Sequence, residues 1–238
     1  MEARLTGADR NEILTYLGYR GGPIPPEVEA DIGRCLDLLM ETARPRVVWR
    51  RFLLDEDGAL LGTDFRPAGE DVKTLLQGCE AVIFLAATLG AEAEALLRRA
   101  QVRNMTDAVI LDACGSAAIE NVCDNLCADL AAEAAPLHLT DRYSPGYGDF
   151  PFAQQRELCR LLNTHRRIGV TVTPGGLMLP QKTVTALLGL SPTPPIRRQQ
   201  GHSHSFHSIV IRPPPLRRRT GSSRNSPSMR MTCRSQSI

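Results

Sequence analysis

The stretch Ala81-Val82-Ile83-Phe84-Leu85-Ala86-Ala87, followed by Thr88-Leu89-Gly90, constrains the fold more than any other part of the sequence. An apolar run of this length is too short to cross a bilayer, but it suits a strand that is buried on both faces. The glycine turn leads into a helical pattern over residues 91–102, so we expect a central strand followed directly by a helix. Many nucleotide sites are built in this way, although one glycine also fits an ordinary turn, which we favour.

The longest helical pattern follows, over residues 105–133. Asn104 or Thr106 is suited to cap it, and Asp107 suits its first turn. Helical spacing gives it an apolar stripe of Ile119, Val122, Leu126 and Leu130. An adjacent, more polar stripe consists of Ser116, Glu120, Cys123, Asp124 and Cys127. One side of this helix should therefore pack on the core, with a functional edge beside it.

The remaining patterns mix helices and strands without strict alternation. We predict further helices over residues 8–17, 26–43, 69–77 and 152–163. We predict further strands over residues 47–54, 60–64, 168–172, 177–180 and 183–190, and a loop over 140–151. This order indicates an α+β fold, in which helices pack on a mixed or antiparallel sheet.

Charge divides the chain into two unequal parts. The whole sequence has 28 basic and 26 acidic residues, a net charge of +2. Residues 191–238 hold nine of the arginines and no acidic residue, which leaves 28 − 9 = 19 basic and 26 acidic residues, or −7, in residues 1–190. We therefore predict one domain over residues 1–190 and a basic tail over residues 191–238.

The tail contains ten Ser, nine Arg and seven Pro. Its apolar residues are too sparse to offset the entropy of ordering, so we expect disorder. Binding of RNA through phosphate contacts is an alternative, but we do not expect nucleic acid as the main partner. The abrupt change in composition also fits an out-of-frame reading of a GC-rich gene, which sequencing of the locus would test. The pattern His202-x-His204-x-x-His207 lacks a supporting acid or cysteine, which disfavours a metal site.

The N-terminus lacks the basic start and apolar run of a signal peptide, and no stretch approaches the roughly 18 apolar residues of a membrane span. We therefore expect a cytoplasmic protein without membrane contact. Its seven cysteines are then expected to be reduced thiols. Cys114, Cys123 and Cys127 lie on the helix at 105–133 and either pack as small apolar residues, which we favour, or form a soft-metal or redox cluster.

Catalytic signatures are missing from the sequence. It has no GxSxG, P-loop, HExxH or GxGxxG motif and no CxxC pair. His138 and His165 are the two histidines before the tail, and each is expected at the surface or a helix end. We therefore assign no catalytic residue and no metal ligand.

Residues 142–147, Arg-Tyr-Ser-Pro-Gly-Tyr, form the richest candidate site. Arg142 offers a planar fork of donors for a carboxylate or phosphate, and Gly146 allows backbone to approach a ligand. Tyr143 and Tyr147 are able to stack on a flat ring, and Glu120 on the preceding helix suits an ammonium or a ribose hydroxyl. These groups fit a zwitterionic ligand with an aromatic base. Alternatively, the segment is a tight loop in which Arg142 pairs with Asp141 or Asp149.

The sequence resembles the reactivation domain of cobalamin-dependent methionine synthase, in the form of its small stand-alone relatives. The resemblance is strongest over residues 75–190. It rests on an Arg-x-x-x-Gly-Tyr pattern after a long helix and on four segments. These are Asp112-Ala113-Cys114-Gly115-Ser116-Ala117-Ala118, Arg142–Tyr147, Ile168–Thr173 and Leu177–Val184.

This resemblance implies a ligand and a role. Members of the family bind S-adenosylmethionine, which remethylates cobalamin after one-electron reduction of the inactive cob(II)alamin state. By resemblance, S-adenosylmethionine would be bound by Glu120, Arg142, Ser144, Gly146 and Tyr147. The implied partners are a cobalamin-binding methionine synthase subunit and an electron donor such as flavodoxin. The family also has an early acidic and a late aromatic ligand residue, and the sequence alone places neither here.

Overall fold

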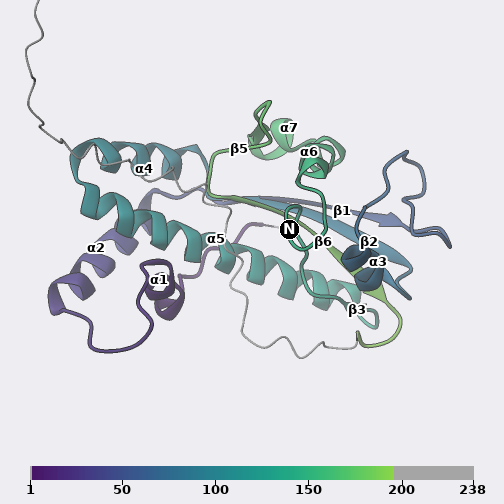
Figure 1. The fold of residues 1–238 in the computed structure, drawn as a ribbon, viewed down its shortest axis with the longest axis horizontal. Coiled ribbons are helices and arrows are strands. Elements are labelled where there is room, and N and C mark those ends of the chain that lie inside the picture. The colour runs from purple at the N-terminus through teal and green to yellow at the C-terminus, as the bar shows by residue number, and fades with distance from the viewer. Residues whose placement is uncertain (1, 196–238) are drawn as a thin grey trace, which may run out of the picture. The chain divides into compact units, whose positions relative to one another are not determined.

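A four-stranded antiparallel sheet with the order β1-β2-β6-β3 forms the centre of the fold (Figure 1). The computed structural model describes residues 2–195. The predictions for the tail beyond residue 195, including disorder, RNA binding and the histidine pattern, therefore lie outside the described residues. Strand bounds in the sheet are β1 Arg46–Leu53, β2 Ala81–Thr88, β3 His138–Leu139 and β6 Thr183–Ser191.

Strand β2 is central because its whole sequence is apolar apart from Thr88. All eight of its residues are buried, as expected for a strand covered on both faces. It pairs antiparallel with β1 on one side and with β6 on the other, so that Phe84 lies opposite Arg50 and Leu187. The prediction of a buried central strand at residues 81–87 is confirmed.

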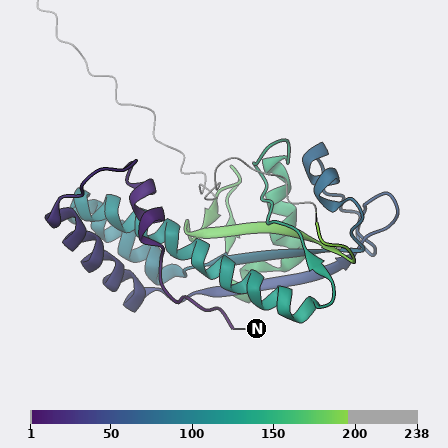
Figure 2. The same ribbon diagram turned by 90° about the horizontal axis from the view of Figure 1, so that it is seen from below.

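One face of the sheet is covered by helix α5, Met105–Ala134, which lies lengthwise against the strands (Figure 2). Leu126 and Leu130 of its apolar stripe pack on Ile83, Leu85 and the inward residues of β6. Beyond the sheet, the first half of α5 packs against three other helices and forms the centre of a helical cluster. These helices are α1 Arg10–Tyr16, α2 Pro26–Thr42 and α4 Ala91–Arg103.

The opposite face of the sheet packs against shorter elements. Phe84, Phe52 and Leu187 meet Leu158 and Ile168 there in a second apolar core. The helices on this side are α3 Glu70–Leu76, the 3₁₀ turn Phe152–Gln154, α6 Gln155–Leu162 and α7 Thr164–Ile168. A separate two-stranded ribbon consists of β4 Thr171–Val172 and β5 Met178–Leu179. The predicted α+β class, with helices on an antiparallel sheet, is confirmed.

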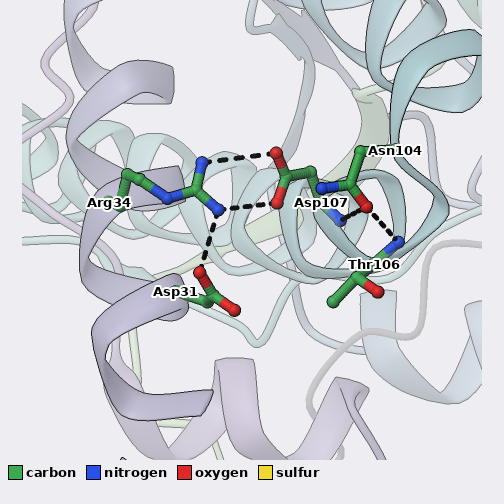
Figure 3. Close-up of polar contacts among 5 residues, drawn as sticks. All are labelled: Asp31, Arg34, Asn104, Thr106 and Asp107. Carbon is green, nitrogen blue, oxygen red and sulfur yellow. Dashed lines mark hydrogen bonds and ion pairs between the residues drawn. The ribbon is translucent and has the colours of Figure 1, made fainter. Parts of the chain in front are cut away.

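Polar contacts fix the N-terminal end of α5 (Figure 3). Asn104 caps the helix by accepting hydrogen bonds from the backbone N–H groups of Thr106 and Asp107. Arg34 of α2 donates to Asp107 at 2.6 Å and to Asp31 at 2.9 Å, so it ties α2 to the start of α5. Because these groups are exposed, the ion pairs position the helices more than they stabilise them.

A buried lysine holds the beginning of β6 against α5. The Lys182 ammonium lies 2.8 Å from Asp112 Oδ1 and donates to Ser116 Oγ at 2.9 Å. Gly115 makes room for it, since a Cβ at that position would lie 3.1 Å from Lys182 Cε. This need for space accounts for a glycine inside a long helix, where it weakens helix formation.

Two local predictions are wrong, and the predicted loop at 140–151 is confirmed apart from one bridge. Residues 60–64 form no strand; a single bridge from Leu54 to Leu60 closes a turn there. In the predicted strand at 168–172, Ile168 ends α7 and Gly169 is left-handed, so that only Thr171–Val172 is extended. The predicted loop at 140–151 follows an unexpected short strand, β3, and Tyr143 continues the edge by exchanging backbone hydrogen bonds with Leu187. The two wrong predictions concern short segments, whose local pattern by itself does not fix their conformation.

The turn at Gly90 is an ordinary strand-to-helix turn. A Cβ there would lie 2.7 Å from the carbonyl oxygen of Arg44, so the loop after α2 fills the space beside it. Within residues 2–195, no helix has both the length and the apolar character of a membrane span.

Candidate functional site

Arg142 and Glu120 form a buried ion pair where the chain leaves the sheet edge and meets α5. Arg142 Nη2 donates to Glu120 Oε2 at 3.0 Å and to Asp124 Oδ1 at 2.8 Å. The side chains of Arg142 and Glu120 are only 9% and 4% exposed, whereas that of Asp124 is 69% exposed. The loop interpretation in which Arg142 pairs with Asp141 or Asp149 is therefore wrong. Arg142 instead joins the loop to two successive turns of α5.

Burial perturbs the titration of Glu120. Loss of water raises the pKa of its carboxyl to about 7, against the opposing effect of Arg142, and the charges of Asp124 and Glu12 raise it further. The pKa of Arg142 is also raised, because nearby thiols and carboxylates outweigh its own burial. Glu120 is thus poised near neutral pH to exchange a proton when a cation approaches.

Helix α1 adds two residues to this site that the sequence did not single out. They are Glu12 and Tyr16. The pKa of the Tyr16 phenol is raised by burial first, and then by the nearby Glu120, Glu12 and Tyr147. Burial and Glu120 likewise raise the pKa of Tyr147 to about 12. An acid and a tyrosine from early in the chain therefore lie around the same carboxylate as the loop. They are found only once α1 is packed on α5, since no motif marks them.

The loop after Arg142 is ordered by its own hydrogen bonds. Tyr147 N donates to the Ser144 carbonyl at 3.1 Å, and Gly146 N donates to the Phe150 carbonyl at 2.8 Å. Gly146 has a φ of +95°, which a residue with a side chain rarely adopts. Tyr143 stacks on Phe150 and donates to Asp71 at 3.0 Å, so it serves the loop and not a ligand ring. The loop is held in place before any ligand binds.

Asp149 attaches this loop to α3. Its carboxylate accepts hydrogen bonds from the backbone N–H groups of Glu70 and Asp71. It thereby caps α3, whose own N-cap residue, Gly69, makes no side-chain cap. We expect Asp149→Ala to lower the free energy of unfolding by about 1 kcal/mol, as loss of a cap does. Hydrogen exchange should quicken at residues 70 and 71. Unchanged exchange there would contradict the capping role.

Buried polar atoms of Glu120 and Ser144 lack a partner among the described residues. Glu120 Oε1 and Ser144 Oγ make no hydrogen bond within residues 2–195, although both residues are more than nine-tenths buried. Buried polar groups are almost always satisfied, so such atoms indicate a bound polar molecule or water. One acceptor and one hydroxyl beside Arg142 suit a ligand that carries both donors and acceptors.

The thiols on α5 behave as packing residues. Cys123 is fully buried beside Arg142, and Cys114 lies in the helical core. Burial raises the pKa of Cys127 to about 11 and that of Cys114 to about 12, which keeps both protonated near neutral pH. No three His, Cys, Asp or Glu side chains between residues 2 and 195 are placed to hold a metal ion. The burial of these thiols and their raised pKa values favour packing as small apolar residues.

The described part of the chain also has an open depression of about 450 Å³. Residues 2–6 and the end of α2 with Pro45 line it. None of the five predicted site residues contributes to it.

The fold is similar to that in the crystal structure of the MetH reactivation domain bound to AdoHcy, with a TM-score of 0.56. The chain shares that fold. The likeness to the reactivation domain covers 78% of this chain and 74% of the other at 16% sequence identity. No protein-family model and no curated protein sequence matches the chain. The predicted reactivation-domain fold is confirmed, and at this identity the comparison shows the fold alone.

Proposed function

We propose that this protein binds S-adenosylmethionine, or its product S-adenosylhomocysteine, between α5 and the loop at 142–147. The observation that carries the proposal is the buried Arg142–Glu120 pair beside the unsatisfied Glu120 Oε1 and Ser144 Oγ. Support comes from the fold shared with a domain whose structure has AdoHcy bound.

The groups of such a ligand match the groups in the site. Arg142 is suited to the methionine carboxylate, because its planar fork binds carboxylates with two parallel hydrogen bonds. Asp124, the exposed partner of Arg142, is able to turn into solvent and give up its place. Glu120 Oε1 would accept from the ammonium or a ribose hydroxyl, and Ser144 Oγ would satisfy another polar group. Backbone at Gly146 and the ring of Tyr147 would border the adenosine.

The residues present fit binding and orientation more than acid–base catalysis. A sulfonium methyl group is already activated, so the protein has to hold the donor in line with its acceptor. We propose that the acceptor is cobalamin carried by a methionine synthase subunit, and that an electron donor such as flavodoxin reduces it. The cofactor supplies the methyl-accepting chemistry, and this chain supplies the position. Glu12 and Tyr16 would close the site from α1.

Calorimetric titration of the full chain with S-adenosylhomocysteine tests the proposal. A ligand cation near Glu120 favours the ionised carboxylate, whose pKa is about 7 in the free protein. Binding should therefore release a proton, and affinity should rise roughly tenfold from pH 5.5 to 7. The ligand's own ammonium titrates above this range and stays charged throughout it.

Glu120→Gln is the matched variant, since it keeps the shape and removes the titration. It should bind with little dependence on pH. If the natural protein does not bind S-adenosylhomocysteine at millimolar concentration, the proposal is refuted. Retention of a cobalamin protein in a pull-down, without ligand binding, would then favour a docking module that does not use S-adenosylmethionine.

A further inference from the structure

Strand β1 is one of the two edges of the sheet, opposite β3 (Figure 2). It is eight residues long and pairs only with β2 among the described strands. Along its outer side, one backbone contact to another segment is found within residues 2–195, from Leu61 N to the Leu53 carbonyl. Such an edge presents unpaired N–H and C=O groups that are able to pair with a further strand.

Exposed arginines from two elements surround this edge. Arg46, Arg50 and Arg51 lie on β1, and Arg166 and Arg167 lie on α7, which packs on β1 through Ile168. We call these five residues the arginine edge. The two elements are contiguous, since Arg46 Nη1 is 3.9 Å from the Cβ position of Gly169, the residue that ends α7.

The arginine edge gathers positive charge beside a free backbone edge. None of its five members forms an ion pair within the described residues, whereas Arg4, Arg10, Arg34, Arg98 and Arg160 elsewhere on the surface do. Other exposed arginines without an ion pair, such as Arg99 and Arg103 on α4, lie away from this backbone edge. Arg50 is also partly fixed, with its guanidinium 4.8 Å from the centre of the Phe52 ring. Unpaired positive charge on a domain of net charge −7 is a local feature that attracts acidic groups.

Like charge disfavours a second copy of this chain as the occupant. Pairing β1 with β1 would bring the arginine edges of two copies together along one seam, where their positive charges repel. A long nucleic acid would meet the net negative charge of the rest of the domain. A peptide strand uses both the free backbone edge and the positive charge beside it. We propose that an extended, acidic segment of a partner protein adds to the sheet at β1. This proposal is independent of the ligand site at Arg142.

The test is fluorescence anisotropy of the full chain with a labelled seven-residue peptide of alternating Glu and Val, at low ionic strength. We expect binding that falls by about tenfold or more when the backbone nitrogens of both the valine and the glutamate residues are methylated, because this removes strand pairing at both edges of the peptide and keeps the charge. The charge reversal Arg50→Glu with Arg166→Glu should cause a similar loss. The matched control is Arg99→Glu with Arg103→Glu on α4, which changes net charge equally and should bind like the natural protein.

Several results would overturn the proposal. No binding, or binding that survives methylation, would exclude strand addition. If the α4 control variant lost peptide binding to the same extent, the effect would be one of net charge alone. Tighter binding of a single-stranded oligonucleotide, lost in the Arg50 and Arg166 variant, would assign the edge to nucleic acid. Self-association in sedimentation, lost in the same variant, would assign it to a second copy.

Discussion

Arg142→Ala is expected to abolish the thermal stabilisation by S-adenosylhomocysteine and to lower the free energy of unfolding by about 3 kcal/mol. The first effect follows because the variant loses the donors for the ligand carboxylate. The second follows because Glu120, with a side chain only 4% exposed, loses its counter-charge. For the natural protein, ligand at 100 times its Kd should add about 2.7 kcal/mol of stability. Melting curves with and without ligand measure both effects.

Two variants separate binding from stability. Arg142→Lys keeps the positive charge beside Glu120 but loses the planar fork, so it should recover most of the stability and still bind about tenfold more weakly. Arg34→Ala is the matched control, because Arg34 also bridges two carboxylates but lies at the surface (Figure 3). It should cost less than about 1 kcal/mol and leave the ligand response unchanged. A full ligand response in Arg142→Ala would contradict the proposed site.

Asp112→Ala is expected to lower the free energy of unfolding by about 2 kcal/mol. The change leaves the Lys182 ammonium buried with Ser116 Oγ as its one remaining partner in the cluster. The cost stays below that of a fully buried pair, since the Asp112 side chain is 41% exposed and water has access to that side. Denaturant unfolding of the full chain measures the effect.

The companion variant Lys182→Met should cost less than Asp112→Ala. Methionine fills the space beside Gly115, and Asp112 is free to turn to water. The double variant should then be as stable as Lys182→Met alone. If Lys182→Met instead proves the more damaging change, the cation is itself needed to join β6 to α5.

Much of the fold could be predicted because several elements are long and strongly patterned. The apolar run at 81–87 permits little besides a buried strand, and the stripe on residues 105–133 permits little besides a helix on the core. The failures are short segments. His138–Leu139 pairs with β6 although nothing local marks it as a strand, and residues 164–168 form a helix that packs on β1.

The candidate site was predicted in part. Glu120 and Arg142 are 22 residues apart in sequence, and the structure brings them into contact at 3.0 Å. Tyr143 looked like a ligand residue but is used by Asp71 and Phe150. Glu12 and Tyr16 went unnoticed because their α1 pattern is that of any short amphipathic helix. Their place beside Glu120 depends on how α1 packs, which their spacing does not encode.

The sequence by itself determined the α+β class, the central strand, the long helix and the loop with its arginine. Each follows from local periodicity, turn chemistry or the donor geometry of one residue type. The tertiary structure alone decided which carboxylates Arg142 meets, that Glu120 loses its water, and that β1 carries unpaired arginines at an open edge. The reason is physical, since burial and the pairing of charges depend on neighbours that are distant in the chain.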